Sequence, residues 1–195
     1  MRRKDREIVD ITEILEIIGK ADVLHLGLFD GEYPYVVPLH YGYEYIDSKL
    51  VLYMHSAREG HKLDLIKVCP NACAELECDT ELISGDEVAC AYGAAYASVI
   101  ARGHAEIVTD VQEKIKGLKL LMKNQTGQEF EINEKMAATV EVIRFEALQF
   151  TAKSRKMPNR GQRQLPVCGS DAINADHSTV FESGNCSTRT DAATA

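Results

Sequence analysis

The sequence predicts a mainly β domain with flanking helices, organised as a small antiparallel barrel. Three observations favour this fold class. About six segments show the alternation or the apolar run of a β-strand, and they follow one another at short spacing. Only two or three helical segments separate these strands. The G-x-G-x-x-G and G-x-x-x-x-G-K-[ST] motifs of parallel-sheet nucleotide-binding folds are absent from the sequence.

The first predicted elements are a helix and a strand. Asp10 and Glu13 have the spacing of a capping box, and apolar residues then line one face, which indicates a helix over residues 10–20. Residues 22–29 alternate with leucines on one side, which indicates a strand. This strand ends at Asp30-Gly31, a hairpin turn signal.

The next segment has the strongest periodicity in the chain. Apolar or aromatic side chains occupy every second position over residues 35–45, which is typical of a long, half-buried strand. Pro38 interrupts it. Because proline cannot donate a ladder hydrogen bond, we expect the strand to be bulged or to lie at a sheet edge there. Such a position leaves backbone groups free to meet a ligand.

The most informative segment is an apolar strand that leads directly into a helix. Residues 50–54 form the strand, and Ser56 and Glu59 have capping-box spacing, which predicts a helix over residues 57–68. The first turn of a helix has unpaired backbone N–H groups and the positive end of the helix dipole, so it stabilises an anion. Side chains that carry or can carry positive charge lie there, namely Arg58, His61 and Lys62. The segment therefore predicts a phosphate site, and the alternative is an ordinary helix cap with solvated charges.

The remaining chain predicts two strands, a helix and a last strand. The strands cover residues 71–79 and 96–108, the helix begins at the Asp110–Glu113 capping box and ends at residues 124–127, and the last strand covers residues 137–150. Residues 80–93 are less regular. Residues 158–195 are rich in small polar residues, so we expect a disordered tail there.

Composition excludes several classes of function. The chain of 195 residues has a net charge of -8, which argues against a nucleic-acid partner. It has no apolar run long enough for a transmembrane helix, and its N-terminus turns polar before a signal peptide could form, so we expect a cytoplasmic protein without a membrane partner. The six cysteines lack paired C-x-x-C spacing, and no carboxylate joins His40, His55 and His61 at a recognisable spacing, so no metal site is predicted.

Four segments together carry a resemblance to a known family. They are Met1-Arg-Arg-Lys-Asp-Arg-Glu-Ile8, Val37-Pro-Leu-His-Tyr-Gly-Tyr43, Leu52-Tyr-Met-His-Ser-Ala-Arg-Glu-Gly-His-Lys-Leu-Asp64 and Tyr96-Ala-Ser-Val-Ile-Ala-Arg-Gly-His-Ala105. Over about residues 1–156 the chain resembles the nitroimidazole-resistance (Nim-type) branch of the pyridoxamine 5'-phosphate oxidase-like flavoproteins. The resemblance implies a six-stranded antiparallel split β-barrel over residues 1–157 that binds FMN at a homodimer interface. It also implies flavin-dependent reduction of small electron acceptors, such as nitro-aromatic or quinone-like molecules.

The resemblance also assigns site residues. It implies contacts to the flavin phosphate from His55, Ser56, Arg58, His61 and Lys62, contacts to the flavin ring from Pro38, Leu39, His40 and Tyr41, and further flavin contacts from Tyr96, Ser98 and Val99. By the same resemblance His55 holds the position of an active-site histidine. A histidine titrates near neutral pH, so His55 is predicted to donate protons.

Two other functions remain open at the level of sequence. An oxidase of the pyridoxamine phosphate type would need a second basic cluster for its substrate, and the sequence shows none outside residues 58–62. A flavin- or haem-binding protein without turnover is the other alternative, and haem ranks below FMN as the expected cofactor.

Overall fold

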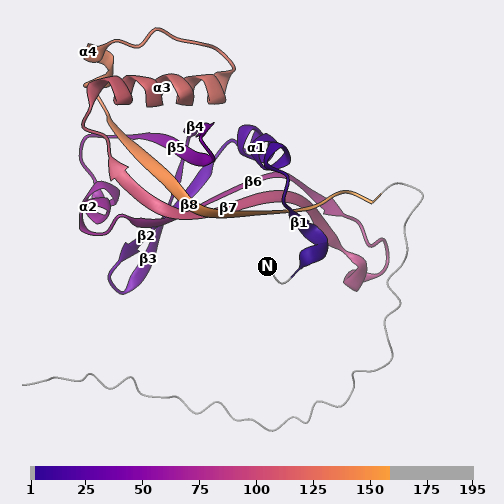
Figure 1. The fold of residues 1–195 in the computed structure, drawn as a ribbon. Coiled ribbons are helices and arrows are strands. Elements are labelled where there is room, and N and C mark those ends of the chain that lie inside the picture. Colours follow the sequence, from indigo (N-terminus) through magenta and orange to yellow (C-terminus); the bar gives the residue numbers. More distant parts are fainter. Residues whose placement is uncertain (1–2, 159–195) are drawn as a thin grey trace, which may run out of the picture. The chain divides into compact units, whose positions relative to one another are not determined.

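A single eight-stranded antiparallel sheet forms the centre of the fold. The computed structural model describes residues 3–158. The strands are β1 (Glu7–Ile8), β2 (Leu24–Asp30), β3 (Tyr33–Leu39), β4 (Tyr41–Ile46), β5 (Lys49–Ser56), β6 (Asn71–Ile83), β7 (Gly93–Ile107) and β8 (Glu141–Arg155). Their order across the sheet is β3-β2-β6-β7-β8-β5-β4, and β1 pairs with β8 (Figure 1).

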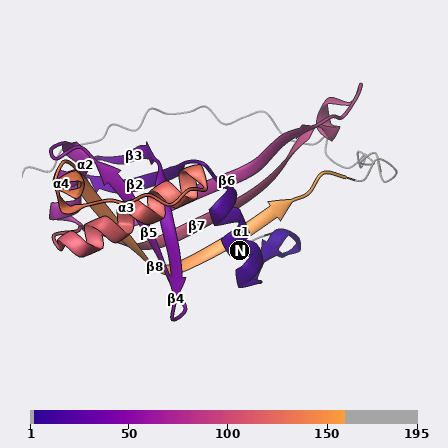
Figure 2. The same cartoon turned by 90° about the horizontal axis from the view of Figure 1, so that it is seen from above.

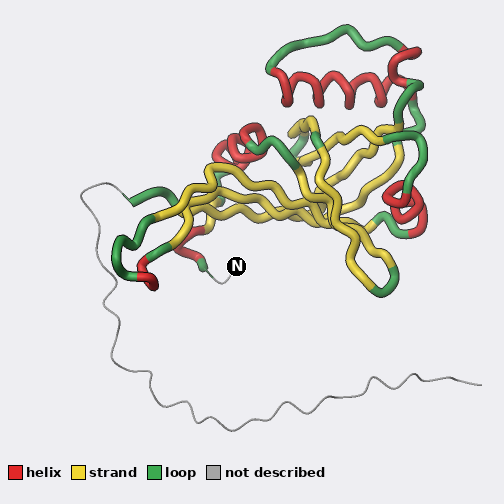
Figure 3. Tube along the Cα trace, turned by 180° about the vertical axis from the view of Figure 1, so that it is seen from behind, coloured by secondary structure: helices red, strands yellow, loops and turns green. Residues whose placement is uncertain are grey.

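Within residues 3–158, four α-helices accompany the sheet. They are α1 (Ile11–Lys20), α2 (His61–Val68), α3 (Val111–Thr126) and the single turn α4 (Glu134–Ala137), and two short 3-10 helices cover Lys4–Arg6 and Ala89–Ala91. Helix α3 packs on β4 and β5, α1 on β6 and β7, and α2 on β2 and β7. Seen from behind, the helices lie at the margins of the strands (Figure 3). None of the helices within residues 3–158 combines the length and apolar character that crossing a bilayer requires.

The predicted fold class is confirmed, but the number of strands is eight rather than six. The pairings are antiparallel, and helices flank the sheet. One additional strand is β1. The other arises because the predicted strand over residues 35–45 breaks at His40 into β3 and β4, which lie at opposite edges of the sheet. Ladder hydrogen bonds do not close the sheet between these two edges within the described residues.

The core fills the space enclosed by the curved sheet and α1. Leu24, Leu26 and Leu28 point inward from β2, as their alternation predicts. They pack in one cluster with inward side chains of the other strands, which include Tyr41, Leu52, Met54, Leu76, Val99, Ile143 and Phe145. Burial of these apolar side chains supplies the main driving force for folding.

Helices α1 and α3 begin where the sequence predicts. Asp10 accepts a hydrogen bond from the Thr12 N–H at 2.7 Å, and Asp110 accepts one from the Glu113 N–H at 2.8 Å. Helix α3 ends at Gly127, whose φ of 69° is the left-handed conformation that favours glycine at a helix C-terminus. Local capping residues therefore determine where both helices begin.

Helix α2 begins later than predicted. The expected capping box at Ser56 and Glu59 is wrong, because Ser56 is the last residue of β5 and lies opposite Glu141 of β8. The helix starts at His61, and its N-cap is Gly60 at a φ of 146°, which L-residues rarely adopt. Strand pairing with β8 extends β5 and displaces the helix start by four residues.

The later strands also differ from their predicted ranges. Strands β6 and β7 continue into residues 80–93, where irregular structure was expected, and they form a protruding hairpin (Figure 2). The last strand starts at Glu141 rather than residue 137, because Asn133 caps the turn of α4 through the Met136 N–H at 3.0 Å. Of the predicted tail, residues 159–195 lie outside the described part of the chain.

Candidate functional site

The predicted phosphate segment contains a buried hydroxyl group without a partner. Ser56 is only 4% exposed, and its Oγ has no hydrogen-bond partner among the described residues. A buried polar atom left unpaired costs about 1–3 kcal/mol, so most such atoms in native proteins have a partner. The position of Ser56, at the end of β5 and shortly before α2, indicates a ligand that accepts this hydrogen bond.

The surrounding charge suits an anion. Arg58 is exposed and Lys62 is half-buried, and neither makes an ion pair within residues 3–158. Helix α2 adds its positive end and the unpaired backbone N–H groups of its first turn. A hydroxyl donor, two cations without carboxylate partners and a helix N-terminus together form a donor set that fits a phosphate group.

The His61 side chain is already engaged. Its Nε2 lies 2.7 Å from Asp30 Oδ2, and its ring meets Tyr35 edge-on, with 5.2 Å between the ring centroids. Asp30 ends β2 and Tyr35 lies on β3, so His61 ties the start of α2 to the β2–β3 hairpin.

The structure brings residues 38–41 close to the phosphate segment. Tyr41 lies opposite Met54 in the β4–β5 pair, so His40 and His55, the next residues outward, reach the same end of that pair. His55 is exposed there, and His40 Nδ1 lies 3.1 Å from the Asp22 carbonyl oxygen. The arrangement places the end of residues 38–41 beside the predicted phosphate segment.

The edge position of Pro38 is confirmed. Pro38 pairs with His25 of β2, and β3 has no second neighbour among the described strands. An edge strand presents free backbone N–H and C=O groups along one side. With half-buried Leu39 beside it, this edge offers both the apolar surface and the backbone groups that a heteroaromatic ring requires.

The side chain of Tyr41 is part of the hydrophobic core. The residue is fully buried, and its hydroxyl contacts the carbonyl oxygens of Ile18 and, at 2.9 Å, Ala21. Burial raises the pKa of its phenol. The Tyr41 carbonyl oxygen accepts hydrogen bonds from the side-chain amides of Asn124 and Gln125, both at 3.1 Å. Tyr41 thus holds α1 and α3 against the sheet, beside the candidate site.

Tyr96, Ser98 and Val99 lie apart from the other predicted contacts. They belong to β7, which β2 and β6 separate from β3, so the path along the curved sheet is about 14 Å at three strand spacings. Val99 points into the core and Ser98, 6% exposed, points to the opposite face. Within one chain, the predicted site residues therefore fall into two groups.

A second basic cluster surrounds Tyr96, although the sequence appeared to have none. Arg6 Nη1 lies 3.4 Å from the Tyr96 hydroxyl, and Lys153 Nζ lies 5.4 Å from the centre of its ring. Arg155 is the cross-strand neighbour of Tyr96 and lies against Gly93. Tyr96 and Arg155 line a cavity of about 770 Å³, whose lining also includes the carboxylates Glu13, Glu16, Asp79 and Glu81. The cluster was missed because strand pairing joins residues from the two ends of the domain, and no local pattern signals it.

Comparison with known proteins identifies a family model that matches residues 10–154. Its description is pyridoxamine 5'-phosphate oxidase. No curated protein sequence matches this chain.

Several solved structures are similar to the chain. A provisionally assigned 5-nitroimidazole antibiotic resistance protein from Bacteroides thetaiotaomicron is 32% identical, with a TM-score of 0.65, over 76% of this chain and 86% of that one. The flavocytochrome Anf3 from Azotobacter vinelandii is 17% identical, with a TM-score of 0.65 over 81% and 73% of the two chains. An FAD and haem binding protein from Mycobacterium smegmatis is 14% identical, with a TM-score of 0.63 over 79% and 76%. The last two similarities concern the fold alone.

Proposed function

Because the chain belongs to the pyridoxamine 5'-phosphate oxidase-like family, in its nitroimidazole-resistance branch, we propose that it is an FMN-dependent reductase. Its substrates would be small nitro-aromatic, 5-nitroimidazole-like or quinone-like molecules, a class supported by the similarity to the Bacteroides thetaiotaomicron protein. The observation that carries the proposal is the buried Ser56 hydroxyl, which has no hydrogen-bond partner in the described part of the chain and lies close in sequence to Arg58 and Lys62. When bound, FMN would supply the electron transfer. The protein would bind the flavin, orient the substrate and protonate it.

The phosphate of FMN fits the donor set at the start of α2. Ser56 would donate one hydrogen bond, and Lys62 and Arg58 would neutralise the phosphate charge. Contacts of this charge-assisted kind are stronger than neutral hydrogen bonds. His61 acts indirectly, because its bond to Asp30 holds the first turn of α2 in place.

The edge of β3 would hold the flavin ring. Pro38, Leu39 and His40 present backbone groups and apolar surface there, next to the backbone of Tyr41. Tyr96, Ser98 and Val99 lie on β7, three strand spacings or about 14 Å away along the sheet. We propose that two copies of the chain form a homodimer with the flavin at their interface, so that each copy completes the site of the other.

His55 is the proposed catalytic residue. It is exposed at the end of β5, directly before Ser56 in the sequence. An imidazole holds and releases a proton near neutral pH. His55 would donate protons to the acceptor molecule as that molecule gains electrons.

The visible spectrum of the purified full-length protein tests this function. We expect flavin absorption, or tight uptake of added FMN, and anaerobic reoxidation of the reduced protein by a 5-nitroimidazole. A Soret band would instead favour haem. A bound flavin that nitro compounds and quinones leave reduced would favour the binding protein without turnover, and a protein that binds neither group contradicts the proposal.

Lys62→Ala tests the phosphate site directly. The loss of a charge-assisted contact should weaken FMN binding by about 1.5–3 kcal/mol, as measured by fluorescence titration of FMN. Lys67→Ala is the matched control, because Lys67 lies in the last turn of the same helix and pairs with Asp64 at 3.2 Å. Equal FMN affinities for the two variants would remove Lys62 from the site.

The basic cluster at Tyr96 favours a second candidate function. An oxidase of the pyridoxamine phosphate type needs cations for its substrate phosphate, and Arg6, Lys153 and Arg155 supply them around an aromatic ring. Oxygen consumption with pyridoxamine 5'-phosphate would distinguish this oxidase from the reductase.

A further inference from the structure

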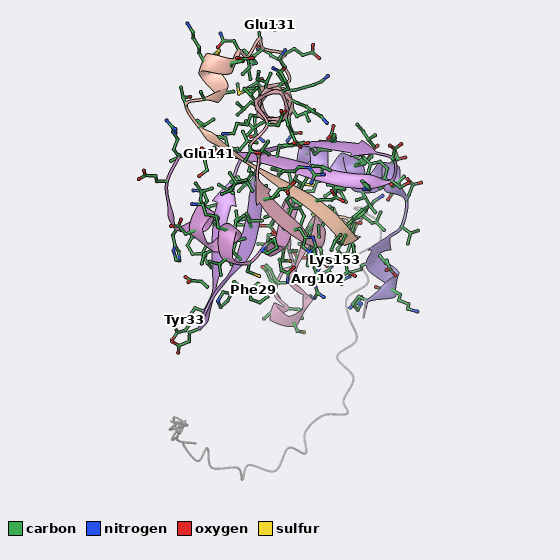
Figure 4. The ribbon with its side chains drawn as sticks, turned by 60° about the vertical axis from the view of Figure 1, so that its left-hand side comes forward. Phe29, Tyr33, Arg102, Glu131, Glu141 and Lys153 are labelled. Atoms are coloured by element: carbon green, nitrogen blue, oxygen red, sulfur yellow. The ribbon has the colours of Figure 1, made fainter. Side chains whose placement is uncertain are left out.

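The open end of the β2–β3 hairpin adjoins the segment that would hold the flavin ring. At the turn of the hairpin Asp30 pairs with Tyr33, and Phe29 and Tyr33 lie there (Figure 4). At the other end His25 pairs with Pro38. Because Pro38 begins the ring-holding segment of the proposed function, an outward side chain at position 25 lies beside that segment.

His25 and Pro38 lie on the same face of the sheet. Leu24 and Leu26 are buried in the core, so the alternation of β2 turns His25 to the outer face. Leu39 packs against the core and Pro38 is exposed, so Pro38 points outward as well. Side chains directly opposite each other in an antiparallel pair have Cβ atoms about 4.5–5.5 Å apart. The imidazole of His25 therefore flanks the surface of Pro38.

A carboxylate on the next strand holds His25. Glu75 of β6 is the cross-strand neighbour of His25, and its Oε2 lies 3.4 Å from His25 Nδ1. On its other side Glu75 faces Ile100 of β7, which offers no polar group. Partial burial, together with the charge of Glu77, raises the pKa of the Glu75 carboxyl above its ordinary value. A hydrogen-bond donor such as the His25 imidazole therefore stabilises the Glu75 carboxylate.

The second ring nitrogen of His25 is free to meet a ligand. Within residues 3–158, His25 Nε2 has no hydrogen-bond partner. A partner on one imidazole nitrogen determines how the other nitrogen is presented, so Glu75 orients Nε2. Among the histidines that the structure describes, only His25 and His61 lie within ion-pair distance of a carboxylate, and the contact of His61 serves to hold α2.

An imidazole beside a flavin ring changes the redox properties of that ring. Reduction adds negative charge to the ring system of a flavin. A positive charge or a hydrogen-bond donor beside the ring therefore favours the reduced state and raises the reduction potential. When protonated, an imidazole held at Nδ1 supplies both through Nε2.

We propose that His25 contacts the flavin ring bound at Pro38 and, held by Glu75, raises the reduction potential of that flavin. The inference rests on the FMN site of the proposed function and adds the residues that set how readily the flavin passes electrons on. His25 contacts the cofactor, whereas Glu75 acts through His25 and is a positioning residue. No bond forms or breaks at either residue in this role.

The midpoint potential of the bound flavin tests His25. It is measured in the full-length holoprotein by equilibration with a dye of known potential. His25→Ala should shift the equilibrium about tenfold toward oxidised flavin, a fall of about 30 mV for a two-electron couple. His104→Ala is the matched control, because His104 is an exposed histidine of β7 that belongs to no proposed site. Equal potentials in the two variants overturn the proposal.

A double-mutant cycle tests the positioning role of Glu75. His25→Ala should lower the potential less in a Glu75→Ala background than in the wild-type background, because His25 is no longer held there. Comparing the two backgrounds removes the direct effect of the Glu75 charge on the flavin. Equal shifts in both backgrounds overturn the role of Glu75.

The imidazole NMR signals provide a test that involves no redox chemistry. Addition of FMN to the flavin-free protein should shift the ring signals of His25, which are assigned by their loss in His25→Ala. The ring signals of His104 should stay in place. FMN that binds without moving the His25 signals overturns this inference and leaves the proposed function standing, whereas a protein that binds no FMN overturns both.

Discussion

At the scale of single residues, Tyr41 connects the N-terminal helix to the sheet. Its hydroxyl meets two carbonyl oxygens at the end of α1, and its ring is fully buried. A phenol in this position must remain protonated to donate its hydrogen bond, and burial disfavours the phenolate. The pKa of Tyr41 is therefore raised above its ordinary value of 10.0.

This raised pKa predicts a loss of stability in alkaline solution. The unfolded chain releases the Tyr41 proton first, so stability from the protonated phenol is complete below pH 10 and falls as pH rises above it, by at most about 1.4 kcal/mol per pH unit. Tyr41→Phe should cost about 1–2 kcal/mol at pH 7 through the lost hydrogen bonds. The difference in unfolding free energy between the two proteins, measured in urea, should shrink above pH 10. Parallel curves from pH 8 to pH 11 would contradict the assignment.

Ser56 shows what sequence reasoning can predict about one residue. Its predicted role as a helix cap was wrong, whereas its contact with an anion stays a prediction. The spacing from Ser56 to Glu59 is the same whether the serine begins a helix or ends a strand. Pairing of β5 with β8 decides between these outcomes, and this pairing involves residues about 85 positions away in the sequence.

At the scale of elements, helix α3 packs unusually close to β4. A Cβ atom at Gly42 would lie 2.2 Å from the backbone of Leu120 and Leu121, so only glycine permits this contact. Polar contacts fix the same interface, because the Tyr53 hydroxyl lies 3.2 Å from carboxylate oxygens of both Glu44 and Glu113. Helix α3 in turn holds the Tyr41 carbonyl through Asn124 and Gln125.

Gly42→Ala should therefore displace α3 and destabilise the protein. Overpacking against backbone that cannot move aside costs about 1–3 kcal/mol. Gly27→Ala is a suitable control, since its added Cβ would meet the nearest atom, the Cys73 carbonyl oxygen, at an ordinary 3.5 Å. Urea unfolding followed by circular dichroism measures both changes. If both variants unfold at the wild-type midpoint, the close contact of α3 with β4 is not as described.

Elements with local signals were predicted well, and elements defined by distant partners were not. Asp10, Asp110 and Gly127 mark the ends of α1 and α3 in the sequence itself. The break at His40 gives no such signal, because Leu39 and Tyr41 keep the same alternation in β3 and β4. Only the sheet order reveals that these two residues belong to opposite edges.

At the scale of the whole described domain, β8 holds the sheet together. It pairs with β5 along one part of its length and with β7 along most of it, and β1 joins it near its end. Strands β3 and β4 have one partner each. The free energy of local opening should therefore differ between strands, and it should be highest in the part of β8 that pairs with both β5 and β7.

Native-state hydrogen exchange would measure this distribution. The backbone amides of residues 142–145, which lie between β5 and β7, should exchange only through global unfolding. Those of β3 should exchange through local opening, whose free energy is several kcal/mol lower than that of global unfolding. Exchange of β3 as slow as that of β8 would mean that a further partner covers the free edge.

The candidate site was predictable in part for the same reason. Residues 38–41 and 55–62 were identified because each is a short, contiguous pattern. Their proximity follows from the β4–β5 pair, and the cluster at Tyr96 follows from pairing with β8, so neither was visible in the sequence. Residues that form one short contiguous pattern can be predicted from the sequence. How separate segments come together depends on the order in which the strands pair.

The passage of the chain through His40 has a mechanical consequence. Leu39 ends one edge of the sheet and Tyr41 begins the other, so a single residue joins the two edges covalently. A force that pulls these edges apart at this point would load the peptide backbone before it loaded any hydrogen bond. The domain would therefore yield elsewhere, by peeling strands from the far ends of β3 and β4, while the junction beside the candidate site stayed intact.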